Sequence, residues 1–144
     1  MAGNNSPIFS RVGAIGLNAG ATLGTTQAQD YTGTNANTAV VFTVDATNGG
    51  YVQRLRFKAL GANTTAAVAR IFFNNGSANA TAANNTFYGE VSLPITSAST
   101  TAATVDVDYP INVALPPGYR VLVNIGSSAN LGTGWSVTVI AGSY

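Results

Sequence analysis

Neither cysteine nor histidine occurs among the 144 residues of this chain. Without cysteine there is no disulfide and no thiolate nucleophile, and without histidine a serine–histidine–aspartate triad cannot form. A zinc site built on imidazole or thiolate ligands is excluded for the same reason. The sequence therefore leaves few routes to enzymatic chemistry, and we expect no catalytic residue, no bound metal and no cofactor.

Charge is scarce as well, because charged residues make up 8% of the chain, against about 25% in an average protein. The formal net charge of +1 gives no reason to expect nucleic acid as a partner, since that normally requires a dense basic patch. No apolar run approaches the roughly 18 residues of a membrane span, and the opening MAGNNSPIF has neither the basic nor the apolar region of a secretory signal. We expect a protein made in a cytoplasm, with no membrane partner.

Alternating apolar residues dominate the last third of the chain, residues 109–144. Such alternation predicts half-buried strands, because successive side chains of a strand point to opposite faces. Three strands are expected here, with Pro117-Gly118 at the centre of a type II turn between the first two. Their apolar faces are Ile111, Val113 and Leu115; Tyr119, Val121, Val123 and Ile125; and Trp135, Val137, Val139 and Ala141.

Further strand patterns precede this region, and no segment shows a helical period over ten or more residues. The expected strands are 38–44, 51–60, 66–73, 86–93 and 105–109, with a ninth candidate within 95–104. Eight or nine short antiparallel strands predict an all-β fold, a two-sheet β-sandwich. The pattern favours a jelly roll, and an immunoglobulin-like sandwich is the alternative, since strand count alone does not separate the two.

The first 37 residues differ from the rest, because glycine, asparagine, threonine and alanine are frequent and the alternation is weak. We interpret residues 1–37 as an extended N-terminal arm with one or two short strands, followed by a β-sandwich domain at 38–144. A flexible terminus is the alternative, but the arm carries more apolar side chains than plain disorder would. Its candidate interface residues are Ile8, Phe9, Val12, Ile15 and Leu17.

Half of the six basic residues lie on a single predicted strand, where Arg54, Arg56 and Lys58 alternate on one face. Asp106 and Asp108 alternate in the same way on another strand. Like charges about 7 Å apart repel one another, so we expect opposing charge nearby. The partner is either the two aspartates, of this chain or of a neighbouring copy, or an acidic patch on another protein. A catalytic or calcium-binding role for the aspartates is less favoured, because nothing else suggests a cleft.

Three stretches of the chain, within residues 50–144, carry a resemblance to a known family. They read RLRFKALGANTTAAVARIFFNNG, TFYGEVSLP and ALPPGYRVLVNIGSSANLGTGWSVTVIAGSY. In strand order and in the LPPGY and GWSVTVIAG segments, the chain resembles small virion proteins of tailed bacteriophages, in particular the head-decorating or cement proteins. The L-x-x-G-Y-x-V-x-V pattern is also similar to the end of trimeric tumour-necrosis-factor-like jelly rolls.

The resemblance implies a homotrimer seated on the capsid surface of a virion, where it would bind neighbouring copies of the major capsid protein. The expected function is therefore a structural one, stabilisation of an assembled capsid. A tail, fibre or adhesion module that recognises a host-surface glycan is the alternative, with Tyr31 and Tyr88 as its candidate aromatic residues. An enzyme is the least favoured class.

Overall fold

The computed structural model describes residues 10–17, 25–26 and 29–144, so Ile8 and Phe9 lie outside the described residues. The described residues form nine strands and one short 3-10 turn, η1 (Ala82–Asn84). The strands are β1 (Val12–Leu17), β2 (Thr25–Thr26), β3 (Ala39–Thr43), β4 (Gly50–Ala59), β5 (Ala67–Asn74), β6 (Asn85–Leu93), β7 (Asp106–Leu115), β8 (Arg120–Ser127) and β9 (Trp135–Ser143). The all-β prediction is confirmed.

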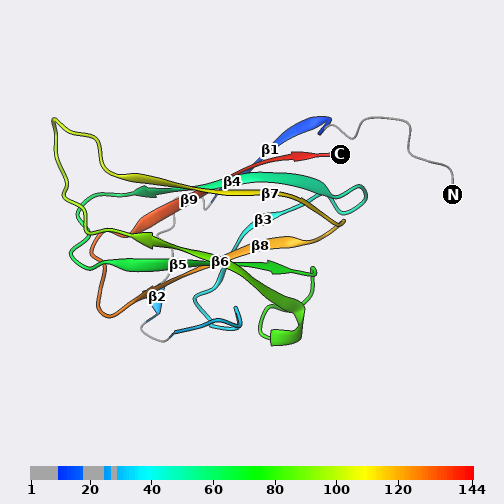
Figure 1. The fold of residues 1–144 in the computed structure, drawn as a ribbon, viewed down its shortest axis with the longest axis horizontal. Coiled ribbons are helices and arrows are strands. Elements are labelled where there is room, and N and C mark those ends of the chain that lie inside the picture. The colour runs from blue at the N-terminus through cyan, green and yellow to red at the C-terminus, as the bar shows by residue number, and fades with distance from the viewer. Residues whose placement is uncertain (1–9, 18–24, 27–28) are drawn as a thin grey trace, which may run out of the picture.

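The strands are arranged in two sheets that pack face to face (Figure 1). Sheet A has the order β1-β9-β4-β7, and sheet B has the order β3-β8-β5-β6 with the two-residue strand β2 beside the same edge of β8. All pairs are antiparallel except β2 with β8. The first strand pairs with the last, as in a jelly roll; an immunoglobulin-like sandwich would join its first two strands in one sheet.

The core lies between the two sheets and is filled by the apolar faces that the alternation predicts. Trp135, Phe57, Leu55, Ile71 and Ile125 are fully buried there. Burial of side chains of this size contributes about 1.5–3 kcal/mol each. The three faces expected in the last third of the chain point inward, which confirms the reading of β8 and β9.

The outer face of β8 is also buried, which the alternation did not predict. Leu122 and Asn124, on that face, have no exposed surface, and neither does Phe72 on the neighbouring β5. The segment 29–38 covers them: a Cβ on Gly33 would lie 3.1 Å from the Phe72 ring, and Asn124 Nδ2 donates to Asp30. The outer faces of β8 and of β5 at Phe72 are therefore covered as well, whereas half-buried strands were expected.

Strand β7 runs without interruption through Pro110, although the sequence pattern ends one strand at Tyr109 and begins another at Ile111. Proline has no backbone N–H to donate. Since β7 is an edge strand of sheet A, a residue whose nitrogen faces away from β4 can lack this donor without losing a hydrogen bond of the sheet. The ninth candidate strand, within 95–104, is a connection that crosses from sheet B to sheet A and reaches outward (Figure 1).

Strand β4 contains a bulge that changes which side chains face the core. The register with β9 shifts between Val52 and Arg54, which leaves Gln53 as the extra residue. Val52 is fully buried and Gln53 is exposed, whereas strict alternation from Tyr51 places Gln53 on the buried face. A bulge inserts one residue into the period of two, so the alternation is correct only from Arg54 onward.

Both short strands within the segment 1–37 pair with the sandwich. β1 pairs with β9 from Val12 to Leu17, and β2 pairs with β8. Gly16 lets β1 cross close to β3, because a Cβ at this position would overlap the carbonyl oxygen of Val41 and lie 2.9 Å from the Phe42 side chain. β1 is therefore held on sheet A by hydrogen bonds and against sheet B by contact.

Candidate interaction surface

The predicted charged residues meet on the outer face of sheet A, where β4 and β7 are neighbours. In the strand register Arg56 lies opposite Asp108, and Lys58 lies opposite Asp106. Arg56 donates from Nε and from Nη2 to the two oxygens of Asp108, at 2.7 Å each. Asp106 lies 3.8 Å from both Arg56 Nε and Lys58 Nζ, and Arg54 Nε is 4.0 Å from Asp108.

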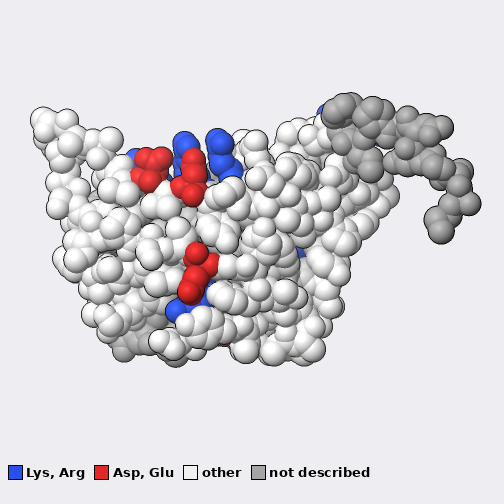
Figure 2. Space-filling model, viewed as in Figure 1, with Lys and Arg blue, Asp and Glu red and all other residues white. Residues whose placement is uncertain are grey.

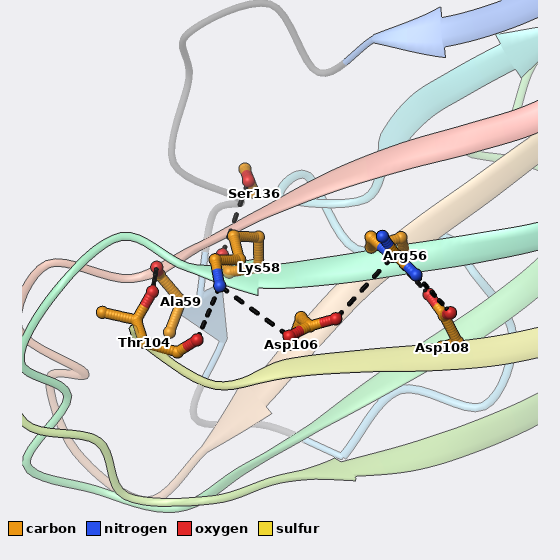
Figure 3. A network of polar contacts seen from close by, with 7 residues as sticks. All are labelled: Arg56, Lys58, Ala59, Thr104, Asp106, Asp108 and Ser136. Carbon is orange, nitrogen blue, oxygen red and sulfur yellow. Dashed lines mark hydrogen bonds and ion pairs between the residues drawn. The ribbon is translucent and has the colours of Figure 1, made fainter. Parts of the chain in front are cut away.

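Figure 3 shows that Arg56, Lys58, Asp106 and Asp108 form a continuous row along the two strands, extended by the bond from Lys58 Nζ to the carbonyl oxygen of Thr104 (2.6 Å). The hydrogen bonds from Arg56 are the main reason why the pKa of Asp108 is lowered, against a desolvation that acts to raise it. Asp108 in turn raises the pKa of Arg56. The sequence allowed several partners for the three basic residues. In the structure they pair with Asp106 and Asp108 of the same chain.

This arrangement leaves the aspartates little capacity for chemistry. Both oxygens of Asp108 are engaged by Arg56, and Asp106 lies between Arg56 and Lys58. Within the ranges that the structure covers, no group of three acidic residues could hold a metal ion. In the same ranges, no helix is long and apolar enough to cross a membrane. The charged row is thus best described as a set of exposed, cross-strand ion pairs.

Strand β1 presents exposed apolar side chains beside this row. Val12, Ile15 and Leu17 are 65%, 66% and 65% exposed. The strand register shows how β1 approaches the charged residues. Ile15 of β1 is paired with Ile140 of β9, which is paired with Arg54 of β4. Two residues further along β1, Leu17 is paired with Thr138, which is paired with Arg56. The outer face of sheet A therefore changes from apolar at the β1 edge, with Ile15 and Leu17, to charged at the β4–β7 edge. Val12 is exposed on the same strand but shares the opposite face with Gly16.

Charged groups are few on the side of the molecule that Figure 2 shows, where the two sheets are seen edge-on: small groups of acidic and basic side chains lie in a largely uncharged surface. A surface with so little charge can approach a partner without a large desolvation penalty. The apolar edge of sheet A and the neighbouring ion pairs are the features on which a partner could be positioned.

The two tyrosines considered for glycan binding do not share a surface. Tyr31 is 48% exposed and contacts Phe87 edge to face on the outer side of sheet B. The ring of Tyr88 instead packs against Phe73 and Tyr109, and its hydroxyl donates to the carbonyl oxygen of Ile111 at 3.0 Å. Tyr88 is 36% exposed, but its ring and hydroxyl are engaged by these contacts, and the two tyrosines offer no common stacking platform.

Two polar residues of sheet B and its cover were not identified from the sequence. Asp30 is 8% exposed and accepts hydrogen bonds from Thr32, Gly33, Asn35 and Asn124. Burial acts to raise the pKa of Asp30, but these hydrogen bonds together lower it. The composition of the segment DYTGTN could have suggested an aspartate-centred turn, because aspartate often accepts bonds from backbone two or three residues ahead.

Arg70 is the second of these residues, and it is 5% exposed on the outer side of β5. The sequence does not predict the burial of Arg70, since an arginine at this position of an alternating strand could equally well extend its guanidinium into solvent.

No protein-family model matches the chain, and neither a curated protein nor a solved structure does so. The resemblance to head-decorating phage proteins therefore stays a hypothesis that depends on the sequence segments themselves.

Proposed function

We propose that this protein is a structural virion component that decorates and stabilises a bacteriophage capsid, as a homotrimer bound to the assembled major capsid protein. The observation that carries the proposal is the exposed apolar edge of sheet A, formed by Val12, Ile15 and Leu17 on β1. Large apolar side chains gathered at a sheet edge commonly mark an association site. The resemblance supplies the identity of the partner.

The physical properties of the fold suit such a role. A protein that binds only the assembled shell stabilises that state by mass action, without any chemical step. A low surface charge reduces mutual repulsion between copies placed close together. The internal pairing of Arg56 with Asp108 also offsets part of the charge at the β4–β7 edge of sheet A.

The glycan-binding alternative is less well supported. It requires aromatic side chains that present their faces to a sugar ring, and Tyr88, although 36% exposed, is engaged by Phe73, by Tyr109 and by its hydrogen bond to Ile111. Tyr31, 48% exposed on the outer side of sheet B, has its ring in edge-to-face contact with Phe87 and over the guanidinium of Arg70. We therefore keep the capsid role as the proposal.

The proposal can be tested by adding the purified chain to particles that lack it and measuring what sediments with them. The double variant Ile15→Ser/Leu17→Ser should fold and lose most of its binding. Ile95→Ser is the matched control, because Ile95 is 63% exposed but lies in the β6–β7 connection. Equal binding of both variants and the native chain would contradict a role for the β1 edge.

The oligomeric state can be measured separately by light scattering over a range of concentrations. A homotrimer should give three times the 14.6 kDa of the chain, since closed cyclic symmetry is the usual way to cover a repeated apolar edge. A monomer at every concentration would contradict the trimer, while leaving capsid binding to be judged by the sedimentation experiment.

A further inference from the structure

A cavity of about 710 Å³ lies on the outer side of sheet B, away from the β1 edge. Its floor is one row of the sheet, in which Val68 of β5 pairs with Ser92 of β6 on one side and Gly126 of β8 on the other. Leu93 and Gln29 contribute to the walls. The volume falls within the roughly 300–1,000 Å³ that is typical of small-molecule sites.

Arg70 lines this cavity and is the only basic residue among the described residues that line it. The aromatic ring of Tyr31 lies over the guanidinium, with 4.7 Å from Cζ to the ring centroid. On the other side, Gly126 leaves space for the group, because a Cβ at that position would overlap Arg70 Nη1. The guanidinium is thus fixed between a ring and a bare stretch of backbone.

Two of the three guanidinium nitrogens of Arg70 have no hydrogen-bond partner among the described residues. Nε and Nη1 are buried and have no hydrogen-bond partner there. Glu90 Oε2 lies 3.4 Å from Nε, an ion pair without a hydrogen bond, and the Glu90 side chain is 48% exposed. A buried guanidinium N–H normally has a partner, since an unpaired buried donor is costly. The missing acceptor points to a ligand.

We propose that this cavity binds a small carboxylate with a short apolar body. A carboxylate offers two acceptor oxygens to the guanidinium fork, and Val68 and Pro94 give the apolar part a place to pack. Glu90 already carries a negative charge against the same guanidinium, which disfavours a dianion such as phosphate. The site is on a different sheet from the β1 edge, so it goes beyond the proposed capsid role and does not depend on it.

Nuclear magnetic resonance of the isotope-labelled full chain tests this directly, with butyrate as the probe. We expect saturable shifts at the Val68 and Gly126 amides and at Arg70 Nε–H. Butyramide, which has the same shape without the charge, and inorganic phosphate should each bind at least tenfold more weakly. Shifts of equal affinity with butyramide or with phosphate, or no saturation with butyrate, would overturn the proposal.

Two variants separate binding from folding. Arg70→Gln should abolish the saturable shifts, and Arg120→Gln, which removes the same charge from another strand of sheet B, should leave them unchanged. If Arg70→Gln does not fold, Ser92→Trp serves instead: Ser92 is exposed and lines the cavity, so the indole should fill the space and leave Arg70 in place. Unaltered butyrate binding by Ser92→Trp, or by a folded Arg70→Gln, would exclude the site.

Discussion

At the scale of single residues, the buried carboxylate of Asp30 organises the cover of sheet B. Its Oδ1 accepts from the backbone of Thr32 and Gly33, and its Oδ2 accepts from the backbone of Asn35 and from Asn124 Nδ2. All of these partners are donors, so the site is built for an acceptor with two oxygens. The loop is held to β8 through Asn124, which connects a local turn to the tertiary structure.

Replacing Asp30 with asparagine should therefore destabilise the protein by about 1–3 kcal/mol, because an amide NH₂ would then face two donors. Urea unfolding of both proteins at neutral pH measures the difference. Asp45→Asn is the control: Asp45 uses only Oδ1, toward Thr47 and Asn48, and asparagine can supply that oxygen. A loss at Asp45 as large as that at Asp30 would argue against this account.

The difference in unfolding free energy between the native protein and Asp30→Asn should also depend on pH. The pKa of Asp30 is lowered in the folded state, so the native protein binds fewer protons there than the unfolded chain does. Its contribution is present above the unfolded pKa of about 3.9 and is lost as the pH falls through the folded pKa. The stability difference between native protein and Asp30→Asn should shrink in this acidic range, and a difference that stays constant down to full protonation would contradict the assignment.

These residues also show where sequence reasoning ended. The turn at Asp30 could be expected from local composition, but its burial could not, because it depends on a segment folding over the outer face of sheet B. Arg70 is a stronger case: whether its guanidinium is solvated or enclosed depends on Tyr31 and Gly126, which are distant in sequence. Such environments arise from tertiary contacts between distant segments, and the alternation of apolar and polar residues does not predict those contacts.

At the scale of elements, the attachment of β1 depends on one close approach. Gly16 lies against Val41 and Phe42 of β3, whereas a Cβ on Gly13 of the same strand would meet nothing within 4 Å. Gly16→Ala should therefore cost about 1–3 kcal/mol through overpacking and loosen β1 from β9. Hydrogen exchange of the β1 and β9 amides should speed up in this variant.

Gly13→Ala is the matched control for that experiment, because it makes the same chemical change with open space around it. It should leave both stability and exchange nearly unchanged. If the two alanine variants behave alike, contact with β3 does not hold β1 in place.

The charged row on β4 and β7 gives the second prediction at this scale. Replacing Arg54, Arg56 and Lys58 together with serine should leave the sandwich folded, since the opposite face of β4 supplies the burial and exposed ion pairs contribute little. Thermal unfolding of the triple variant at low and high salt measures this. The loss should appear instead as weaker trimers or lower occupancy on particles, and should diminish as salt rises.

Two results would contradict this reading of the row. A triple variant that fails to fold would make the row part of the structural core. Unchanged trimers and unchanged occupancy at every salt concentration would leave it as a solvated face without a role in association.

The strands themselves were largely predictable, and the exceptions have physical causes. Alternation located the strands of both sheets because each has at least one buried face. It failed at Gln53, where a bulge inserts a residue into the period, and at Pro110, where an edge position tolerates a proline within β7. The alternation of apolar residues predicts neither exception, because the bulge and the tolerated proline both depend on which neighbouring strands pair with β4 and β7.

At the scale of the whole molecule, strand count and patterning predicted a sandwich but did not separate its topologies. The jelly-roll order follows from the pairing of β1 with β9 and of β3 with β8, contacts between the two ends of the chain that local sequence does not specify. The same order places β1 at an edge and leaves Val12, Ile15 and Leu17 exposed. The candidate surface is therefore a product of topology as well as of composition.

The central claim, that this protein decorates a capsid, is tested most directly by its copy number in purified particles. Quantitative mass spectrometry can compare its abundance with that of the major capsid protein in the same sample. A decoration protein should be present in numbers comparable with the capsid protein, because it repeats across the shell. A few copies per particle, as for a fibre, or none at all, would contradict the proposal.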